Sequence, residues 1–216
     1  MKRLVIAAAA FAFSSTPAFA EDTDWSGVYV GVQAGYGWGH ADQPYGSLNA
    51  TTFPSTQDAA DQSGAVGGLY AGYNIQAGSA VLGLEGDFNI DGIDGDDAQS
   101  GGDTNGVKHR WNANIRARAG MLVAPGTLVY AAGGVSFLNG KATNLDATPV
   151  EEIPTDWTGW TLGGGIEQAF GTNLKARIEY RYSDYGKSVA NFPLSGYSEQ
   201  IQPKINTVMV GVAYKF

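Results

Sequence analysis

Apolar and polar residues alternate along most of this chain, and the stretch 204–216 has the clearest alternation. From residue 208 onward every second residue is apolar, namely Val208, Val210, Val212, Tyr214 and Phe216. The residues between them are mostly small or polar. A repeat of two residues is the period of a β-strand, whose side chains point alternately to its two faces. Residues 204–216 are therefore predicted to form a strand with one apolar face.

Seven earlier segments show the same alternation, so eight strands are predicted. They span residues 27–38, 65–76, 80–90, 110–123, 127–137, 158–170, 174–185 and 204–216. Short turns of three residues join some neighbouring strands, at 77–79, 124–126 and 171–173. The other connections are long and polar, at 39–64, 91–109, 138–157 and 186–203.

Long and short connections alternate, so all long loops fall at one end of the sheet. This is typical of barrels in the bacterial outer membrane, which have an even number of strands, short periplasmic turns and long outward loops. The sequence predicts an all-β fold, an eight-stranded antiparallel up-and-down transmembrane β-barrel with four long outward loops and three short periplasmic turns. The alternative is a soluble sandwich or lipocalin-like barrel, which would be polar outside and apolar inside. Here the charged residues share the glycine-rich face, which is the inverted arrangement.

Aromatic residues on the apolar face fall into two groups when each strand is followed in its direction. Near the long loops lie Trp38, Phe88, Trp111, Phe137, Trp160 and Tyr182. Near the short turns lie Tyr73, Phe170, Tyr214 and Phe216. Aromatic rings favour the boundary between membrane and water, so two membrane girdles are predicted.

The first 20 residues have the three regions of a secretory signal peptide. Lys2 and Arg3 precede the apolar run LVIAAAAFAF, and AFA precedes Glu21. Cleavage after Ala20 would leave residues 21–216 as one outer-membrane β-barrel domain, with the net charge changing from −8 to −10 as Lys2 and Arg3 are lost. The chain contains no Cys, so no disulfide supports the exported fold. No apolar run reaches about 18 residues, so helical membrane spans are excluded.

Five motifs carry a resemblance to a known family. They are DWSGVYVGVQAGYGWG (24–39), VLGLEGDF (81–88), RARAGM (116–121), IEYRYSDYG (178–186) and VGVAYKF (210–216). In this order they are similar to the alphaproteobacterial outer-membrane immunogenic proteins, small porin-family barrels of the rhizobial and Brucella type. The resemblance implies an abundant, surface-exposed, antigenic eight-stranded barrel. Some relatives are described as porins and others as heme binders, but neither activity has a motif that can be carried over to residues here.

The charged residues of the strands are predicted to point into the barrel. They are Glu85, Asp87, Arg110, Arg116, Arg118, Glu167, Lys175, Arg177, Glu179 and Arg181. The turn at 171–173 places Glu167 opposite Arg177, and Glu85 is expected to lie close to Arg116. An isolated charge in a narrow lumen is costly, so an interior network of ion pairs is expected. The functional alternative is a narrow channel in which these charges set ion preference.

Loop residues offer weaker candidates for chemistry. The acidic stretch 91–97 lacks the spacing of an EF-hand and is interpreted as a solvated loop, with weak binding of divalent cations left open. His40 beside Asp42 and His109 beside Asp103 supply residue types for a heme ligand or a catalytic base at the surface. No nucleophile motif accompanies them, so no catalytic residues, metal site or cofactor are assigned. The acidic net charge opposes binding to nucleic acid.

The sequence thus predicts a non-enzymatic outer-membrane barrel with a structural, surface-exposed role in envelope integrity and host contact. The alternatives are a small porin, a surface heme binder and a lipid-modifying enzyme. The expected partners are outer-membrane lipid and lipopolysaccharide, the barrel assembly machinery through Phe216, and a host or extracellular ligand at the loops.

Overall fold

The computed structural model of the protein describes residues 24–53, 59–98, 104–145 and 147–216. The predicted signal peptide, residues 1–20, lies outside these ranges. Every helix or strand assigned within them is a β-strand. In the same residues, no helix has the length and apolar character needed to cross a membrane.

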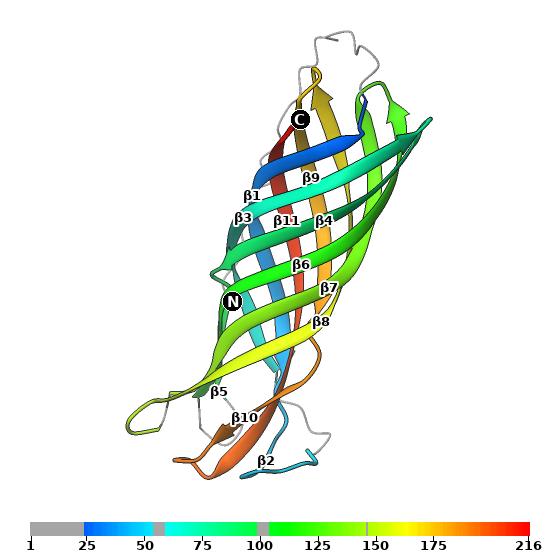
Figure 1. The fold of residues 1–216 in the computed structure, drawn as a ribbon. Helices are drawn as coiled ribbons and strands as arrows, with labels where there is room; N and C mark the ends of the chain where they lie inside the picture. The colour runs from blue at the N-terminus through cyan, green and yellow to red at the C-terminus, as the bar shows by residue number, and fades with distance from the viewer. Residues whose placement is uncertain (1–23, 54–58, 99–103, 146) are drawn as a thin grey trace.

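Eight long strands form a closed antiparallel barrel, as predicted (Figure 1). They are β1 (Gly27–Asp42), β3 (Ala59–Ala77), β4 (Ala80–Asp91), β6 (Thr104–Ala124), β7 (Thr127–Asn144), β8 (Glu151–Phe170), β9 (Leu174–Asp184) and β11 (Tyr197–Lys215). Around the barrel their order is β1, β11, β9, β8, β7, β6, β4 and β3, and pairing between β1 and β3 closes the ring. Closure leaves no free edge in the wall, so each backbone group can bond to a neighbouring strand.

The short turns at one end of the barrel each contain a glycine in the left-handed region of φ. Gly78, Gly126 and Gly171 have φ of 61°, 70° and 70°. Other residues adopt this conformation only with strain, whereas glycine adopts it freely. These residues therefore set the tight connections β3–β4, β6–β7 and β8–β9.

The opposite end of the barrel differs from the sequence prediction, because strands continue into the predicted loops. The segment 138–157 is mostly the continuation of β7 and β8, and three short strands, β2 (Tyr45–Ser47), β5 (Asp94–Ala98) and β10 (Ser188–Phe192), add to this end. The strands extend because their inward side chains go on packing against one another, as Leu138 and Trp157 do. The predicted strand boundaries stopped at the predicted aromatic girdle, whereas the alternation of inward and outward side chains runs beyond it.

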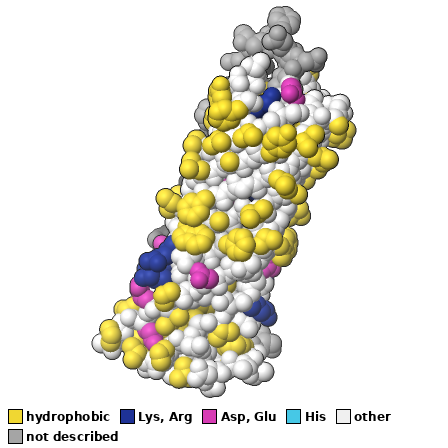
Figure 2. All heavy atoms as spheres, in the orientation of Figure 1, with side chains coloured by type: hydrophobic (Ala, Val, Ile, Leu, Met, Phe, Trp, Pro, Cys, Tyr) yellow, Lys and Arg dark blue, Asp and Glu magenta, His cyan; other side chains and the backbone are white. Residues whose placement is uncertain are grey.

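The outer wall of the barrel is apolar, as Figure 2 shows over most of its length. Leu84 and Ile115 are 65% and 66% exposed, although both belong to central parts of their strands. The side chains of the ten predicted girdle residues are all exposed or half-buried on this wall. A wall of this kind matches the lipid-facing surface of a membrane barrel.

One predicted inward residue, Arg110, lies on the outer wall instead. The register between β6 and β7 shifts between His109 and Trp111, which is a β-bulge. The extra residue breaks the alternation of faces. Arg110 and Trp111 consequently both turn outward, while His109 turns inward and is buried.

Close contact between β6 and β7 provides a test of this packing. A Cβ atom added at Gly134 would lie 2.0 Å from the carbonyl oxygen of Ile115, whereas one added at Gly86 would meet nothing closer than 3.7 Å. We expect Gly134→Ala to lower the free energy of unfolding by about 1–3 kcal/mol through overpacking. Gly86→Ala is the control and should change it by less than about 0.5 kcal/mol. Urea titration of the refolded protein in micelles measures both, and equal stability of the two variants would contradict the assigned register.

Candidate functional site in the barrel interior

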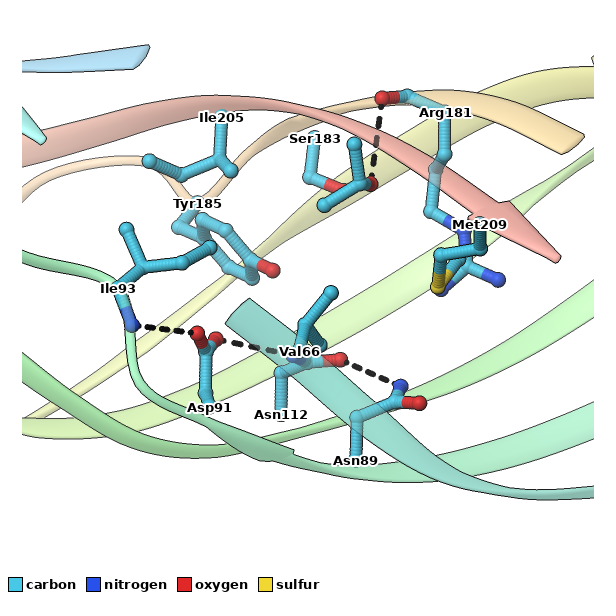
Figure 3. A pocket seen from close by; sticks show the side chains of 11 residues that line it. Val66, Asn89, Asp91, Ile93, Asn112, Arg181, Ser183, Tyr185, Ile205 and Met209 are labelled. Carbon is cyan, nitrogen blue, oxygen red and sulfur yellow. Dashed lines mark hydrogen bonds between the residues drawn. The ribbon is translucent and has the colours of Figure 1, made fainter. Parts of the chain in front are cut away.

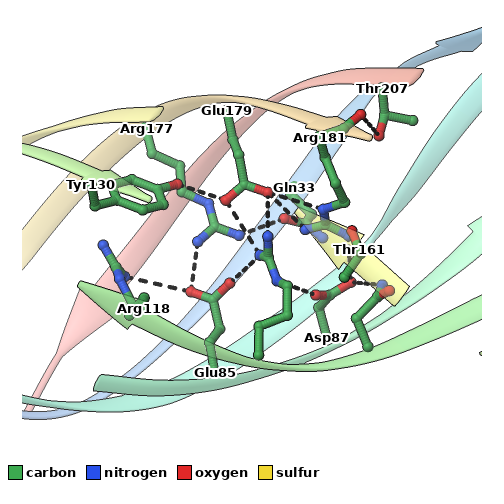
Figure 4. A network of polar contacts seen from close by, with 12 residues as sticks. Gln33, Glu85, Asp87, Arg118, Tyr130, Thr161, Arg177, Glu179, Arg181 and Thr207 are labelled. Atoms are coloured by element: carbon green, nitrogen blue, oxygen red, sulfur yellow. Dashed lines mark hydrogen bonds and ion pairs between the residues drawn. The ribbon is translucent and has the colours of Figure 1, made fainter. Parts of the chain in front are cut away.

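Arg116 joins three carboxylates into one charge network in the barrel interior. Figure 4 shows these carboxylates, on Glu85, Asp87 and Glu179. The side chain of Arg116 is fully buried and reaches carboxylates on both sides of the lumen. Nη2 lies 2.5 Å from Glu85 Oε1 and Nη1 lies 2.8 Å from Glu179 Oε1. Nε lies 3.6 Å from Asp87 Oδ2. One guanidinium thus joins carboxylates from β4 and β9, which face each other across the barrel.

Three further arginines complete the network on either side of Arg116. Arg118 binds Glu167 at 2.6 Å, Arg177 binds Glu85 at 2.7 Å, and Arg181 binds Glu179 at 2.9 Å and Asp87 at 3.1 Å. The network therefore contains four arginines and four carboxylates. Because the charges balance, the narrow lumen can bury them without a net charge.

Neutral polar side chains use the remaining bonding capacity of the carboxylates. The hydroxyl of Tyr29 donates to Glu85 at 2.8 Å, and the hydroxyl of Tyr130 donates to Glu179 at 2.7 Å. Asn89 and Asn114 donate to Asp87 Oδ1 at 2.6 and 2.8 Å. A buried network of this kind is rigid, because losing any member leaves another group unsatisfied.

The structure places nine of the ten predicted lumen residues inside the barrel, and Arg110 is the exception. Glu85 pairs with Arg116 in register and also binds it. Glu167 stands opposite Arg177 in register, as predicted, but its ion pair is with Arg118. The guanidinium of Arg177 instead crosses the lumen to Glu85. Register is a property of one hairpin, whereas partners across the lumen depend on how the whole barrel closes.

Trp25 fills the end of the lumen near the short turns. It precedes β1, is completely buried and packs with Val81, Leu128 and Tyr130. The ammonium nitrogen of Lys175 lies 3.9 Å from the centre of its ring, a cation–π contact. The sequence interpretation began the first strand at residue 27 and missed this role, although Trp25 belongs to the conspicuous motif DWSG.

An apolar cluster fills the other end of the lumen. Its buried members are Ala41, Ile93, Val107, Leu138, Ala142, Trp157, Tyr185, Ala190, Phe192, Ile201 and Ile205. The hairpin of β10 and β11 contributes Phe192 and Ile201, and the indole nitrogen of Trp157 donates to the carbonyl of Ile201 at 3.1 Å. Glu151 holds the tip of the hairpin by accepting bonds from the backbone N–H of Leu194 and the hydroxyl of Ser195, both at 3.1 Å.

A small cavity separates the charge network from the apolar cluster (Figure 3). Asn89, Asp91, Arg181, Ser183 and Tyr185 are among the residues that line it. The volume open to the centre of a water molecule is about 10 Å³, which is room for roughly one water. The described interior is thus filled in three layers. Trp25 lies at the end with the short turns, the charge network lies in the middle, and the apolar cluster lies at the opposite, outward end.

The two histidines have different environments, and one corrects the sequence interpretation. The side chain of His109 is 0% exposed and its Nδ1 lies 3.6 Å from Asp91 Oδ2, so His109 is not a surface ligand. The bulge at Arg110 turned it inward. His40 is exposed, with Nε2 3.9 Å from Asp42 Oδ1. Asp103, the proposed neighbour of His109, lies outside the described residues.

The acidic stretch 91–97 is not a solvated loop throughout. Asp91 is buried in the lumen, where it accepts bonds from the backbone of Ile93 and from Asn112 at 3.2 and 3.0 Å. Residues from Asp94 onward form β5, which pairs with β6. In the part of the chain that the structure describes, no group of three or more His, Cys, Asp or Glu could hold a metal ion.

A closed barrel with an apolar wall and a charged, filled interior defines an outer-membrane β-barrel protein. Residues 6–216 match the family described as outer membrane protein beta-barrel domain, and the chain belongs to this family. The protein is therefore located in the outer membrane, where lipid and lipopolysaccharide surround it. The short turns face the periplasm. The opposite end, formed by the extensions of the long strands with β2, β5 and β10 and here called the extracellular ribbons, faces outward.

Curated relatives come from alphaproteobacteria, as the resemblance implied. The chain is 33% identical to a 31 kDa outer-membrane immunogenic protein of Brucella melitensis, covering 93% of this chain and 88% of the relative. It is 32% identical to a 22 kDa outer membrane protein of Rhizobium leguminosarum bv. viciae, covering 89% and 78%. Among solved structures, the outer membrane protein OprG from Pseudomonas aeruginosa has a TM-score of 0.54 at 16% identity, covering 90% of this chain and 98% of OprG. This last likeness concerns the fold alone.

The network predicts that Arg116 is essential for stability. Arg116→Ala would leave Glu85 and Glu179 buried beside fewer cations, which should lower the free energy of unfolding by about 3–5 kcal/mol. Lys204→Ala is the control, because Lys204 binds Asp42 at 2.7 Å in a partly exposed ion pair worth less than about 1 kcal/mol. Urea unfolding followed by tryptophan fluorescence measures both. Similar losses in the two variants would show that the interior ion pairs do not form the core.

Proposed function

We propose that this protein acts through its outer surface and extracellular ribbons, as a closed barrel that strengthens the envelope and contacts the surroundings of the cell. The observation that carries the proposal is the filled lumen. Trp25, the charge network around Arg116 and the apolar cluster around Trp157 occupy successive levels of the interior. A solute would have to displace all three layers to cross.

The small-porin alternative is weaker for the same reason. Ion channels need charged or carbonyl groups that face water, whereas the charged groups here bond to one another. The cavity beside Asp91 has room for roughly one water molecule, and the apolar cluster closes it on the outward side. We infer that any conductance requires opening of the barrel rather than passage through the resting state.

Side chains exposed on the extracellular ribbons are available for contact with the surroundings of the cell. Apolar residues are exposed there, namely Tyr45, Leu48, Val150, Val189 and Leu194. The relatives named as immunogenic support a surface that is displayed to the outside. We propose this end of the barrel as the region that meets a host or extracellular ligand.

We further propose that the protein is not an enzyme. Catalysis by a hydroxyl nucleophile needs a base held within hydrogen-bonding distance and an acid that orients it. His109 is sealed inside the barrel, and His40 is a surface residue whose nearest carboxylate, on Asp42, is 3.9 Å away. The curated relatives are named for outer-membrane location and immunogenicity, which supports this interpretation.

The conductance of the refolded protein in planar bilayers tests the closed barrel directly. We expect no discrete current steps from the wild-type protein, because the three layers of described side chains leave no water-filled path across the interior. Heat-modifiable migration on a gel must show that the same sample is folded. Discrete steps that change in Arg116→Ala would overturn the proposal and favour a channel lined by the inward charges.

We also propose that Tyr214, on the outward face of β11, and Phe216, directly after β11, form the signal that the barrel assembly machinery reads. Their rings lie 5.2 Å apart in an edge-to-face contact, and Phe216 is 73% exposed. Export through the inner membrane is assigned to residues 1–20.

Phe216→Ala should reduce the amount of folded protein in the outer membrane several-fold in cells, because the machinery would bind the strand less well. Refolding into micelles in vitro should stay unchanged, because the side chain makes little contact with the rest of the barrel. Outer-membrane fractionation measures the first effect and gel mobility the second. Unchanged assembly in cells, or loss of refolding in vitro, would contradict this role.

A further inference from the structure

Cationic side chains gather at one place on the outer wall. Lys108, Arg110 and Lys141, here called the basic cluster, project outward from β6 and β7. Lys108 and Lys141 stand directly opposite each other in the pairing of the two strands. In Figure 2, Lys and Arg atoms lie together with acidic atoms at the edge of the hydrophobic band. The chain is acidic overall, with a net charge of −8, so this concentration of cations is unusual for it.

The β-bulge in β6 builds the cluster. Regular alternation would point Arg110 into the lumen, as the sequence analysis expected. The register shift between His109 and Trp111 turns Arg110 to the outer wall, on the same face as Lys108. Bulges redirect single side chains and often mark functional places in a sheet.

The cluster is short of anionic partners among the described side chains. Glu152 accepts a hydrogen bond from Lys141, and that bond is the main cause that lowers the pKa of Glu152, with Lys108 and Arg110 contributing electrostatically. Asp94 stands opposite Lys108, and Asp156 accepts a bond from Asn139 at 2.7 Å. Within the described residues, neither aspartate forms an ion pair with the cluster. Like charges placed opposite each other destabilise a sheet unless an anion compensates.

The depth of the cluster in the membrane indicates which anion it meets. Arg110 adjoins the girdle residue Trp111, and Lys141 follows the girdle residue Phe137 by four positions. A tilted strand advances roughly 2.5 Å along the barrel axis per residue, so the cluster spans about 2–10 Å beyond the girdle. The headgroup layer of a bilayer is roughly 5–8 Å thick on each side. Long Lys and Arg side chains reach readily within such a layer.

We propose that Lys108, Arg110 and Lys141 form a binding site for the phosphate groups of a phosphorylated glycolipid in the outer leaflet. The two outward residues of β6 would bind the phosphate, Arg110 through its planar fork of donors and Lys108 as a point charge. Lys141, held by Glu152, closes the site on the side of β7. A lipid bound here fixes the height of the barrel in the membrane and ties it to the outer leaflet. The phosphate belongs to a lipid headgroup rather than to a soluble molecule, because the basic cluster lies at the edge of the apolar wall.

Native mass spectrometry of the refolded full chain in neutral detergent tests the site. The probes are bis-phosphorylated lipid A, the same lipid without its phosphates, and inorganic pyrophosphate. Lys108→Gln with Arg110→Gln should weaken binding of bis-phosphorylated lipid A about ten- to thirty-fold, since each cation near an anionic headgroup contributes about 1 kcal/mol. Lys187→Gln with Lys204→Gln is the matched control, because it removes the same charge from the outward end of the barrel, and it should leave the affinity unchanged.

Further measurements on the same samples decide between the possible outcomes. Lys108→Arg with Arg110→Lys should keep at least about a third of the affinity, since both charges remain. Equal weakening by the control pair, or equal binding of the lipid without phosphates, would overturn the proposal, because either shows that no local phosphate contact is made. Pyrophosphate binding as tight as that of lipid A, with the same dependence on Lys108 and Arg110, would assign the site to a soluble phosphate instead. Heat-modifiable mobility of each variant confirms that loss of binding is not loss of folding.

Discussion

The cost of burying charge in a narrow space controls the structure of this protein. An eight-stranded barrel has an interior just wide enough for side chains, so every inward charge must find its partner inside. Arg116 meets this requirement by binding Glu85 and Glu179 from opposite sides of the lumen. The wall strands are thus joined twice, by hydrogen bonds around the ring and by ion pairs across it.

The filled interior and the apolar exterior have the same physical origin. Lipid cannot solvate a charge, so the charged residues of each strand collect on the inner face and leave the outer face apolar. At the outward end, beyond the hydrocarbon of the membrane, the relation reverses. Leu138, Trp157 and Phe192 are buried inside there, while Lys108, Lys141 and Glu152 face outward. The same strands therefore enclose a charged interior in the middle of the barrel and an apolar interior at its outward end.

The change from a charged to an apolar interior takes place near the predicted aromatic girdle, and the bulge at Arg110 lies beside the predicted girdle residue Trp111. Trp111 belongs to the lipid-facing wall, while Arg110 and Lys108 belong to the headgroup layer and the water beyond. His109 is turned inward at the same level and meets Asp91 above the charge network. One inserted residue in β6 thus turns His109 into the lumen and turns Lys108 and Arg110 to the outer wall.

Sequence alone determined the eight long strands of the wall and the face on which most of their residues lie, because alternation with a period of two is a local property. It also determined the register across the tight turns, such as Glu167 opposite Arg177 across the turn 171–173, because a tight turn fixes the register. The ion pair of Glu167 with Arg118, the burial of Trp25 and the apolar cluster at the outward end depended on closure of the barrel, which brings distant strands together. The bulge at Arg110 has no signal in the alternation, since it is the place where alternation fails. Tertiary structure decided these features because each depends on contacts between residues far apart in the chain.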